Sequence, residues 1–262
     1  MQRVSSRQNP RLREAARLIA SSRDRRKAGK CVLEGEHLIG VYFERMQAPE
    51  YLLVVDERLT DARIAALVAR MPAGDVVAVS STLFAEVATL PAAVGVLAVV
   101  PTPRHEVPAP GRFHLLLDDL QDPGNVGTIL RTAAAAGVEQ VLLSKHCAFA
   151  WSPKVLRAGQ GAHFLTTVVE DVDLAAWAAS FRERGGHVAA MVAHHGADLY
   201  ATSLQWPLAI AVGNEGAGLS APLAECADTR ITIPMPGGME SLNAAAAAAV
   251  VLFEAVRRGR SG

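Results

Sequence analysis

Residues 113–136 read FHLLLDDLQDPGNVGTILRTAAAA, and this stretch decides the class of fold. The apolar run Phe113–Leu117 is typical of a buried strand, and a helical pattern follows over Val126–Ala136. Between them Pro123-Gly124 predicts a turn, after which Asn125 is placed to cap the helix. A strand that leads through a short loop into a helix is the first half of a β–α–β unit, so the stretch predicts an α/β protein with a parallel sheet.

The alternation of strands and helices continues to the C-terminus, which predicts a parallel sheet with helices on both faces. Ligands bind beyond the carboxyl ends of the strands in such sheets, so the loops there form the candidate site. The expected helices are Val126–Ala136, Leu174–Arg184, a weaker one near Pro222–Ala227, and Asn243–Arg258. The expected strands are Phe113–Leu117, Gln140–Leu143, Thr166–Val169, His187–Val192, Leu208–Val212 and Arg230–Ile233.

A smaller α/β domain precedes this sheet. Residues 101–111 contain four prolines, which fix φ and lack a backbone donor, so the stretch is unsuited to a helix or a central strand. The predicted division is an N-terminal domain at 1–104, a linker at 105–111 and a C-terminal domain at 112–262. The elements expected in the first domain are a helix that starts at Asn9-Pro10, strands near 31–35, 51–55 and 76–79, and helices near 36–46 and 60–70.

The charge of the chain is unevenly distributed. The formal net charge is zero, yet residues 1–30 hold ten Arg and Lys against two acidic residues, so they carry +8 and the remainder carries −8. A basic end on an acidic protein suggests a polyanion partner, nucleic acid first, although a solvated helix face gives the same pattern. Neither a membrane span nor a signal peptide is evident, and three scattered cysteines oppose a disulfide framework or a thiolate zinc site. We expect a cytoplasmic protein without a metal.

Three loops after expected strands carry the candidate chemistry: 118–131, 213–218 (GNEGAG) and 233–243 (IPMPGGMESLN). A helix N-terminus beside a turn, as in the first loop, suits an anionic group such as a phosphate. Three glycines within six residues let the backbone of the second loop pass closely around a ligand. Their spacing is not the dinucleotide fingerprint, which disfavours a nicotinamide-dependent oxidoreductase.

In this order, DPGNVGTILRTA at 122–133, VGNEGAGL at 212–219 and IPMPGGMESLNAA at 233–245 resemble the three signature motifs of the SpoU (TrmH) family of RNA ribose 2′-O-methyltransferases, within the SPOUT superfamily. SPKVLRA at 152–158 resembles a further family segment, although Gly159 stands where many members have serine. SRQNPR at 6–11 and LEGEHLI at 33–39 resemble the family's substrate-binding domain. The resemblance covers nearly the whole chain.

The resemblance implies a C-terminal trefoil knot that binds S-adenosylmethionine, in a protein that works as a homodimer. Backbone around Gly213, Ile233 and Leu242 would hold the adenosyl part, with Gly216 and Met235 nearby. The family's active-site positions fall on Asn125, Arg131, Glu215, Ser241 and Asn243.

Two of these roles have alternatives. Helix capping explains Asn125 and Asn243 as well as catalysis does. The family proposal has Arg131 activate the 2′-hydroxyl, but a guanidinium is essentially never deprotonated in proteins. We therefore expect Arg131 to orient the target nucleotide through its phosphate and to stabilise the developing alkoxide.

The basic N-terminal segment would capture structured RNA through Arg7, Arg11, Arg25 and Arg26. The function predicted from the resemblance is methylation of a ribose 2′-hydroxyl, with ribosomal RNA as the substrate. The alternatives are a transfer RNA substrate, or a non-catalytic RNA-binding module of the same fold.

Overall fold

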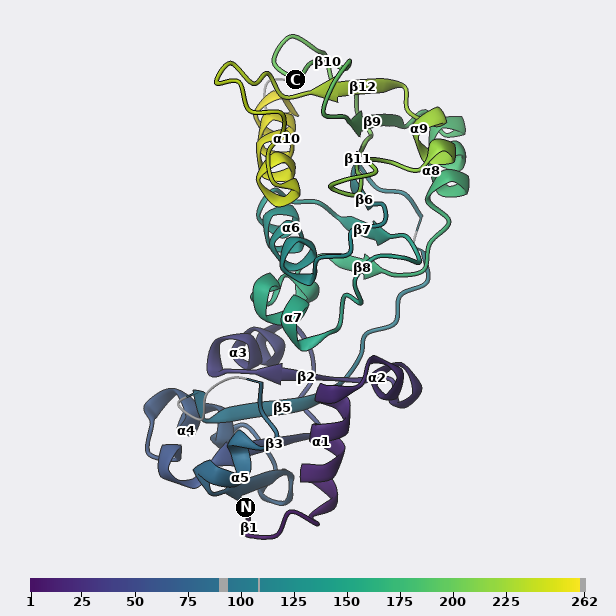
Figure 1. Ribbon diagram of the computed structural model, residues 1–262. Helices are drawn as coiled ribbons and strands as arrows, with labels where there is room; N and C mark the ends of the chain where they lie inside the picture. The colour runs from purple at the N-terminus through teal and green to yellow at the C-terminus, as the bar shows by residue number, and fades with distance from the viewer. Residues whose placement is uncertain (90–93, 108, 260–262) are drawn as a thin grey trace. The chain divides into compact units, whose positions relative to one another are not determined.

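The computed structural model describes residues 1–89, 94–107 and 109–259, and the chain folds into two compact units (Figure 1). The first unit is Met1–Pro103 together with Trp151–Phe164, and the second runs over Arg104–Ala150 and from Leu165 onward. Residues 151–164 were predicted to belong to the C-terminal domain, whereas they pack with the first unit. Pro108 of the predicted linker and residues 260–262 lie outside the described residues.

The first unit contains a five-stranded sheet in the order β1-β4-β3-β5-β2. Strand β5 is antiparallel to both of its neighbours, while β1, β4 and β3 are parallel to one another. Pro101 is the last residue of β5, opposite Lys30, so the first proline of the Pro-rich stretch belongs to the sheet. The strands are β1 Gln2–Val4, β2 Lys30–Glu34, β3 Tyr51–Val55, β4 Val76–Val79 and β5 Val96–Pro101.

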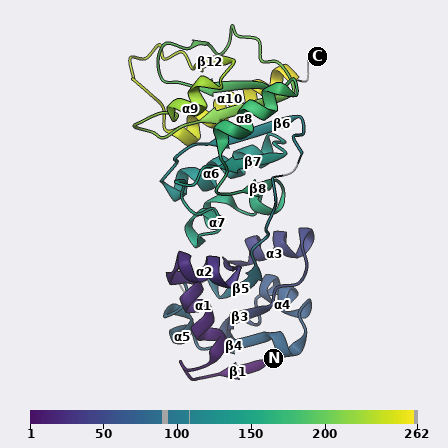
Figure 2. The ribbon, with the colours of Figure 1, turned by 90° about the vertical axis from the view of Figure 1, so that its right-hand side faces the viewer.

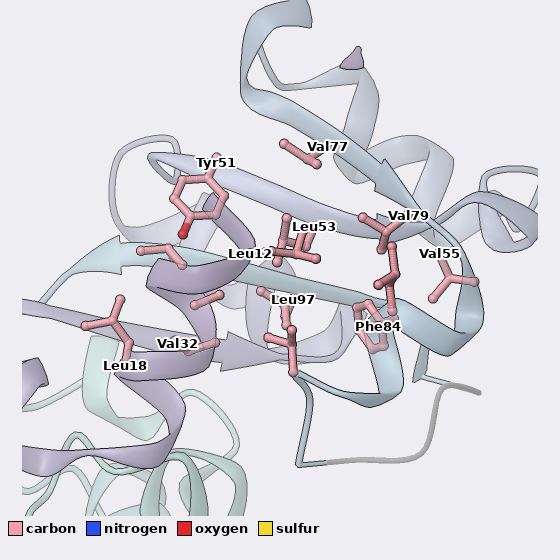
Figure 3. Packing of buried hydrophobic residues seen from close by; sticks show 14 residues of the cluster. Leu12, Leu18, Val32, Tyr51, Leu53, Val55, Val77, Val79, Phe84 and Leu97 are labelled. Carbon is pink, nitrogen blue, oxygen red and sulfur yellow. The ribbon is translucent and has the colours of Figure 1, made fainter. Parts of the chain in front are cut away.

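Helices cover this sheet, and the predicted start of the first one is confirmed. The side chain of Asn9 accepts hydrogen bonds from the backbone N–H groups of Arg11 and Leu12, at 3.0 and 3.4 Å, and Pro10 is the first helical residue. Leu12 and Leu18 of this helix join a buried cluster with Leu53 and Phe84 (Figure 3). The helices are α1 Pro10–Ala20, α2 Ser22–Ala28, α3 Glu36–Arg45, α4 Ala62–Ala69, α5 Ser81–Ala85 and α7 Pro153–Gly159.

The second unit contains a seven-stranded parallel sheet in the order β10-β12-β9-β11-β6-β7-β8. Helices α6 (Pro123–Ala135) and α10 (Ala244–Gly259) cover one face, and α8 (Leu174–Glu183) and α9 (Ala221–Glu225) cover the other (Figures 1 and 2). The predicted parallel sheet with helices on both faces is confirmed, and the trefoil knot stays a prediction. The strands are β6 Phe113–Leu117, β7 Gln140–Leu143, β8 Thr167–Val169, β9 His187–Met191, β10 Ala197–Asp198, β11 Leu208–Val212 and β12 Thr229–Thr232.

The central strands of this sheet, β6 and β11, are buried on both sides because helices cover both faces. Leu115, Leu116 and Leu117 of β6 are all fully buried. His114 is a buried polar residue of β6, and its ring lies edge-on to Trp177 and to Phe181, with ring centroids 5.1 Å apart in each pair. Burial lowers the pKa of His114, so this residue is a neutral member of the core rather than a ligand.

The order of the strands reverses between β6 and β11. From β6 the chain proceeds outward through β7 and β8, and it then crosses to build β9, β11 and β12 on the other side. At such a switch point the loops that leave two adjacent strands diverge, and a crevice opens at their carboxyl ends. None of the helices described here is long and apolar enough to cross a membrane.

Candidate active site at the carboxyl edge of the parallel sheet

Helix α6 begins three residues earlier than the sequence pattern predicts, and this changes the role of Asn125. Asp122 is the N-cap: its Oδ1 accepts a hydrogen bond of 2.8 Å from the backbone N–H of Asn125, and Pro123 is the first helical residue. The prediction that Asn125 caps α6 is therefore wrong. Its side chain projects from the first turn and is available for other contacts.

Asn125 lies in the middle of a chain of hydrogen bonds that joins all three candidate loops. Its Nδ2 donates to Oε1 of Glu215 at 2.5 Å, and its Oδ1 accepts from Nδ2 of Asn243 at 3.0 Å. These residues are far apart in sequence, and each comes from a different loop. The structure thus brings together three of the five predicted active-site residues.

Asn243 has two roles at once. Its Oδ1 accepts hydrogen bonds from the backbone N–H groups of Ala245 and Ala246, at 2.9 and 3.3 Å, which is an N-cap for α10. Its Nδ2 remains free to donate to Asn125. The two alternatives considered for Asn243, capping and a place in the active site, are therefore compatible, because they use different atoms of one amide.

The glycine-rich loop 213–218 is held in shape by Asn214. Its Oδ1 accepts from the backbone N–H groups of Gly216 and Ala217, at 2.9 and 3.0 Å, and its Nδ2 donates to the carbonyl of Asp119 at 2.9 Å. Gly213 is needed because a Cβ there would lie 2.3 Å from the carbonyl carbon of Gly218. The tight loop leaves Glu215 at its tip.

The buried residue Asp118, next to this loop, connects the ends of β6 and β11 through hydrogen bonds. Asp118 directly follows β6, and its Oδ2 accepts a hydrogen bond of 2.8 Å from the backbone N–H of Ser220. Its own N–H donates to the carbonyl of Val212 at 2.9 Å. Neither Asp118 nor Asn214 was among the predicted site residues. Their positions within two residues of the ends of apolar strands are the signal that could have found them.

A cavity of about 450 Å³ opens beside this chain of side chains, and every predicted cofactor-binding residue lines it. The glycine-rich loop forms one wall, and Ala244, Ala247 and Val251 of α10 form another. The end of β9 adds residues that the sequence did not suggest, Met191 to Ala193. The predicted residues that line the cavity are Gly213, Gly216, Ile233, Met235, Leu242, Glu215 and Ser241.

The cavity suits S-adenosylmethionine. Its volume lies in the range of small-molecule sites, and apolar side chains and exposed backbone dominate its walls, as a purine requires. Two charged side chains of opposite sign, Arg230 and Glu240, also line it. The close passage at Gly213 leaves room there for a ligand rather than for a side chain.

Arg131 is separate from this chain of hydrogen bonds. It lies on α6 six residues after Asn125, its side chain is exposed, and it does not line the cavity. Among the residues that the structure describes, it has no hydrogen-bond or ion-pair partner. Ser241 is exposed at the cavity wall. Neither residue contacts Asn125, Glu215 or Asn243 through a hydrogen bond in the described chain.

The four arginines predicted to bind RNA have different surroundings. Arg7 is exposed and pairs with Glu86, and Arg26 is exposed. Arg11 is half-buried: it pairs with Asp75 at 2.8 Å and lies over the ring of Tyr51.

Arg25 corrects the prediction, because this side chain is only 5% exposed. Its Nη1 donates to the backbone carbonyls of Leu18 and Ile19, the latter at 2.9 Å, where α1 ends. These carbonyls belong to the last turn of a helix and have no partner within it. Arg25 therefore caps α1 and is not on the RNA-accessible surface.

The residue types that bind metals are scattered over the described part of the chain. Across the described ranges, no group of three His, Cys, Asp or Glu side chains could hold a metal ion. The pair His194-His195 is exposed, with ring centroids 6.3 Å apart. The cysteines are free thiols: Cys31 is buried, and Cys147 and Cys226 are half-buried. The absence of a metal stays a prediction.

Fold and site together place the chain among the α/β methyltransferases that use S-adenosylmethionine, and comparisons with known proteins carry this further. Residues 112–253 match the model of the SpoU rRNA methylase family, and residues 9–98 match that of the MRM3-like substrate binding domain. The chain therefore belongs to the SpoU rRNA methylase family, and it is an RNA ribose 2′-O-methyltransferase.

Several relatives match over nearly the full length of the chain. The 23S rRNA (guanosine(2553)-2′-O)-methyltransferase RlmP of Bacillus subtilis is 32% identical, over 97% of this chain and 98% of that protein. The crystal structure of the SpoU methyltransferase AviRb from Streptomyces viridochromogenes in complex with its cofactor superposes with a TM-score of 0.86 at 28% identity, over 97% of this chain and 100% of that one. An rRNA methyltransferase from Sinorhizobium meliloti with bound cofactor gives 0.81 at 26% identity, over 98% of each chain.

Proposed function

We propose that this chain methylates a ribose 2′-hydroxyl in ribosomal RNA, with the large-subunit RNA as the target. The observation that carries this proposal is the hydrogen-bonded row of side chains Glu215–Asn125–Asn243, of which Glu215 also lines the cavity beside the glycine-rich loop. The choice of RNA is supported by RlmP, a 23S rRNA methyltransferase to which both parts of this chain are similar.

The residues of the site divide into two roles. Backbone at Gly213, Ile233 and Leu242 would hold the adenosyl part of S-adenosylmethionine, with Gly216 and Met235 beside it. When bound, this cofactor supplies a methyl group on a positively charged sulfur, which needs no further activation. The protein therefore has to align the 2′-oxygen with that methyl group and let the hydroxyl proton leave.

Asn125 is the centre of the alignment. Because Glu215 accepts from its Nδ2 and Asn243 donates to its Oδ1, the amide is fixed in one orientation. Ser241, on the same wall as Glu215, completes the polar rim of the cavity. Together these groups form hydrogen bonds with the incoming ribose.

Arg131 approaches the nucleotide from α6. A guanidinium remains protonated, so it acts through charge and through its fork of N–H donors. It binds the phosphate of the target nucleotide and stabilises the alkoxide that develops on the 2′-oxygen. An exposed side chain that has no partner among the described residues is suited to this role.

The substrate-binding surface lies on α1, α2 and the segment before α1. Arg7 is exposed in that segment and Arg26 is exposed on α2, while the buried Arg25 fixes the end of α1. Replacing Arg7 and Arg26 together by alanine should weaken binding of ribosomal RNA without affecting cofactor binding. Unchanged RNA affinity at physiological salt would contradict this assignment.

The protein acts as a homodimer, and the exposed face of α10 is the contact surface. Phe253 is 49% exposed, and Val250 and Ala246 lie one and two turns before it on the same side. An apolar helix face of this kind is typical of an interface. Light scattering should give twice the chain mass, and Phe253→Lys should give a monomer. A wild-type protein that is monomeric at micromolar concentration would exclude the homodimer.

The test of the reaction is transfer of labelled methyl from S-adenosylmethionine to total RNA from a strain that lacks this gene, with the modified positions mapped by ribose-methylation sequencing. A single labelled ribose in 23S rRNA is the expected result. A label in transfer RNA would overturn the choice of substrate. Cofactor binding without any labelling of RNA or of ribosomal particles would favour a non-catalytic RNA-binding module.

A further inference from the structure

A second cavity, of about 480 Å³, opens at the opposite end of the parallel strands from the cofactor cavity. Arg112, directly before β6, lines it together with Trp206, which lies two residues before β11. The last residues of α10, Arg257 to Gly259, close it. We call it the arginine–indole pocket. Among the described residues that line this pocket none is acidic, so its charge is positive.

The indole of Trp206 is a fixed wall of the pocket. Its ring packs edge-on against the buried ring of Phe113, with centroids 4.9 Å apart. From another side, α10 passes so close that a Cβ at Gly259 would lie 2.9 Å from Cζ2 of the indole. The residue is half-buried, so part of the ring remains accessible from the pocket.

Arg112 supplies a cation whose hydrogen-bond donors are available. Its guanidinium carbon lies 5.1 Å from the centre of the Trp206 ring, in a cation–π arrangement. The side chain is exposed, and within the described residues its guanidinium has no hydrogen-bond or ion-pair partner. A guanidinium held at a ring in this way presents its planar fork of donors to a phosphate.

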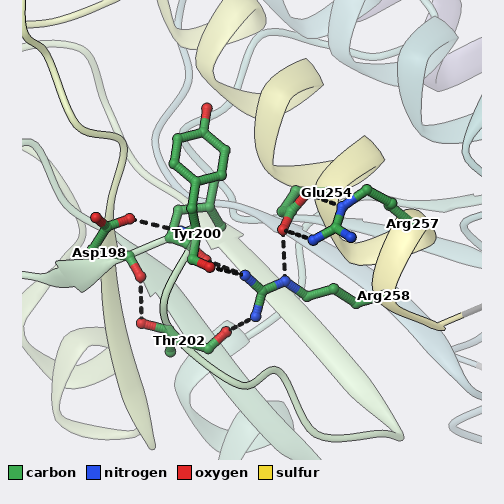
Figure 4. A network of polar contacts seen from close by, with 7 residues as sticks. Asp198, Tyr200, Thr202, Glu254, Arg257 and Arg258 are labelled. Atoms are coloured by element: carbon green, nitrogen blue, oxygen red, sulfur yellow. Dashed lines mark hydrogen bonds and ion pairs between the residues drawn. The ribbon is translucent and has the colours of Figure 1, made fainter. Parts of the chain in front are cut away.

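The opposite wall is braced by the two arginines of the last turn of α10 (Figure 4). Arg257 forms two hydrogen bonds of 2.7 Å with the carboxylate of Glu254. Arg258 donates to the same carboxylate at 2.6 Å and to the backbone carbonyls of Leu199, Tyr200 and Thr202. A second carboxylate lies beside the pocket, because Oε1 of Glu139 accepts a hydrogen bond of 3.1 Å from the backbone N–H of Arg112. Three arginines against these two carboxylates leave a net charge of +1 around the pocket.

A positive pocket with an accessible aromatic ring recognises a flat base and an adjacent phosphate. Stacking on an indole needs no particular base, and an arginine on the same ring binds the backbone. We propose that the arginine–indole pocket binds a single-stranded nucleotide of the RNA substrate, away from the ribose that is methylated. This inference rests on the proposed function, because it assumes an RNA substrate for the same domain.

The pocket lies at the amino ends of β6 and β11, and the cofactor cavity lies at their carboxyl ends. A β-strand rises about 3.3 Å per residue, so five-residue strands separate the two sites by roughly 15 Å or more. That separation corresponds to several nucleotides of an extended strand. The pocket would therefore select RNA that is single-stranded a few nucleotides from the modified position.

The test uses the full chain and a labelled single-stranded RNA of ten nucleotides. Arg112→Glu should weaken its affinity at least about fivefold, and it should reduce the slope of log affinity against log salt by about one. The matched control is Arg184→Glu: Arg184 is an exposed arginine just beyond α8, at the same end of the strands but on the other face. This control should change the affinity little.

A second variant tests whether RNA contacts the indole of Trp206, through the fluorescence of this side chain. Short RNA should quench the tryptophan fluorescence of the wild type, and Trp206→Phe should remove most of this change, because Trp151 and Trp177 are buried. Equal RNA affinity in Arg112→Glu, Arg184→Glu and the wild type would overturn the proposal. Equal competition by polyglutamate and RNA would also overturn it, in favour of an acidic protein partner.

Methyl transfer and cofactor binding are measured on the same variants. These measurements distinguish failure of the pocket hypothesis from failure of the proposed ribosomal RNA target. Loss of RNA binding with unchanged affinity for S-adenosylmethionine supports the pocket. If wild-type protein binds the short RNA through Arg112 but methylates no ribosomal RNA, the RNA-binding role of the pocket is supported and the proposed ribosomal RNA target is contradicted. If wild-type protein methylates ribosomal RNA and Arg112→Glu binds the short RNA normally, the proposed target is supported and the RNA-binding role of the pocket is contradicted.

Discussion

The carboxylate of Glu215 accepts a hydrogen bond of 2.5 Å from the side-chain amide of Asn125, ninety residues earlier in the chain. This contact fixes the amide so that its oxygen faces Asn243. The pair joins the loop that follows β6 to the loop that follows β11, across the point where the strand order reverses. The Glu215 side chain is exposed, so we propose that this acceptor orients the active site rather than packing against other residues.

Glu215→Ala should therefore reduce methyl transfer and leave cofactor affinity nearly unchanged. A hydrogen bond to a charged group contributes about 1.5 kcal/mol or more, which corresponds to about a tenfold loss of kcat. The matched control is Glu225→Ala, an exposed carboxylate at the end of α9. Steady-state kinetics on both variants checks this, and equal activity of the two would refute the role of Glu215.

Substitutions of Arg131 test whether methyl transfer requires the planar guanidinium or only a positive charge. Arg131→Lys keeps the positive charge but loses the planar fork, so we expect both Arg131→Lys and Arg131→Ala to lose most of the activity. Because the side chain is exposed, neither change should alter the unfolding temperature. Single-turnover methyl transfer at saturating RNA distinguishes the variants. Full activity of Arg131→Lys would eliminate the bidentate role.

The glycine-rich loop offers a pair of substitutions with opposite expectations. At Gly213 an added Cβ would lie 2.3 to 2.5 Å from backbone atoms of Gly218 and Leu219, so Gly213→Ala must displace the loop. Overpacking of this kind costs about 1–3 kcal/mol. At Gly216 the nearest atom is Oδ1 of Asn214 at 3.6 Å, an ordinary contact.

Gly213→Ala should therefore lower both the unfolding temperature and the affinity for S-adenosylmethionine, whereas Gly216→Ala should leave the unfolding temperature nearly unchanged. Thermal unfolding and titration calorimetry measure the two effects. Similar behaviour of the two variants would show that the close passage at Gly213 is not what shapes the cavity.

The parallel sheet could be predicted because its strands are buried on both faces and are therefore continuous apolar runs. Among the strands that were not predicted, β5 is a buried apolar run to which no element was assigned, whereas β1 and β10 lack this signal. Strand β1 reads Gln-Arg-Val at the exposed edge of its sheet, and β10 has only two residues, both exposed. Their pairing is specified by the neighbouring strand rather than by their own composition.

The loops that form the site could be predicted from the sequence, but the contacts between their side chains could not. The segment Asp122-Pro-Gly-Asn125 offers two residues able to cap a helix, and only the position of Pro123 at the start of α6 selects the first. Arg25 shows a similar limit. A count of basic residues records their sign but not their burial, and burial here depends on carbonyls exposed where α1 ends.

Cys31 should be unreactive in the folded protein. It lies in β2 and is fully buried, and burial raises the pKa of its thiol to about 12. Since the thiolate is the reactive form, about one thiol in ten thousand would be ionised at pH 8. Iodoacetamide at pH 8 should label Cys31 only after urea is added, as mass spectrometry of the peptides can show. Labelling of Cys31 in the native protein as fast as that of Cys226 would contradict its burial.

Glu254 should make the second unit sensitive to acid. Hydrogen bonds from Arg257 and Arg258 lower the pKa of its carboxyl to about 2, below the value of about 4.3 for an unfolded chain. Between these values the unfolded chain binds more protons than the folded one, so the stabilisation is complete above about pH 5 and is lost as the pH falls toward 2. Glu254→Gln should therefore unfold more easily at pH 7 and lose less stability between pH 5 and 2.5 than the wild type. Urea unfolding followed by circular dichroism, with Glu225→Gln as the control, measures the difference. Stability curves of wild type and Glu254→Gln that run parallel over this range would show that the carboxylate is not held by the two arginines.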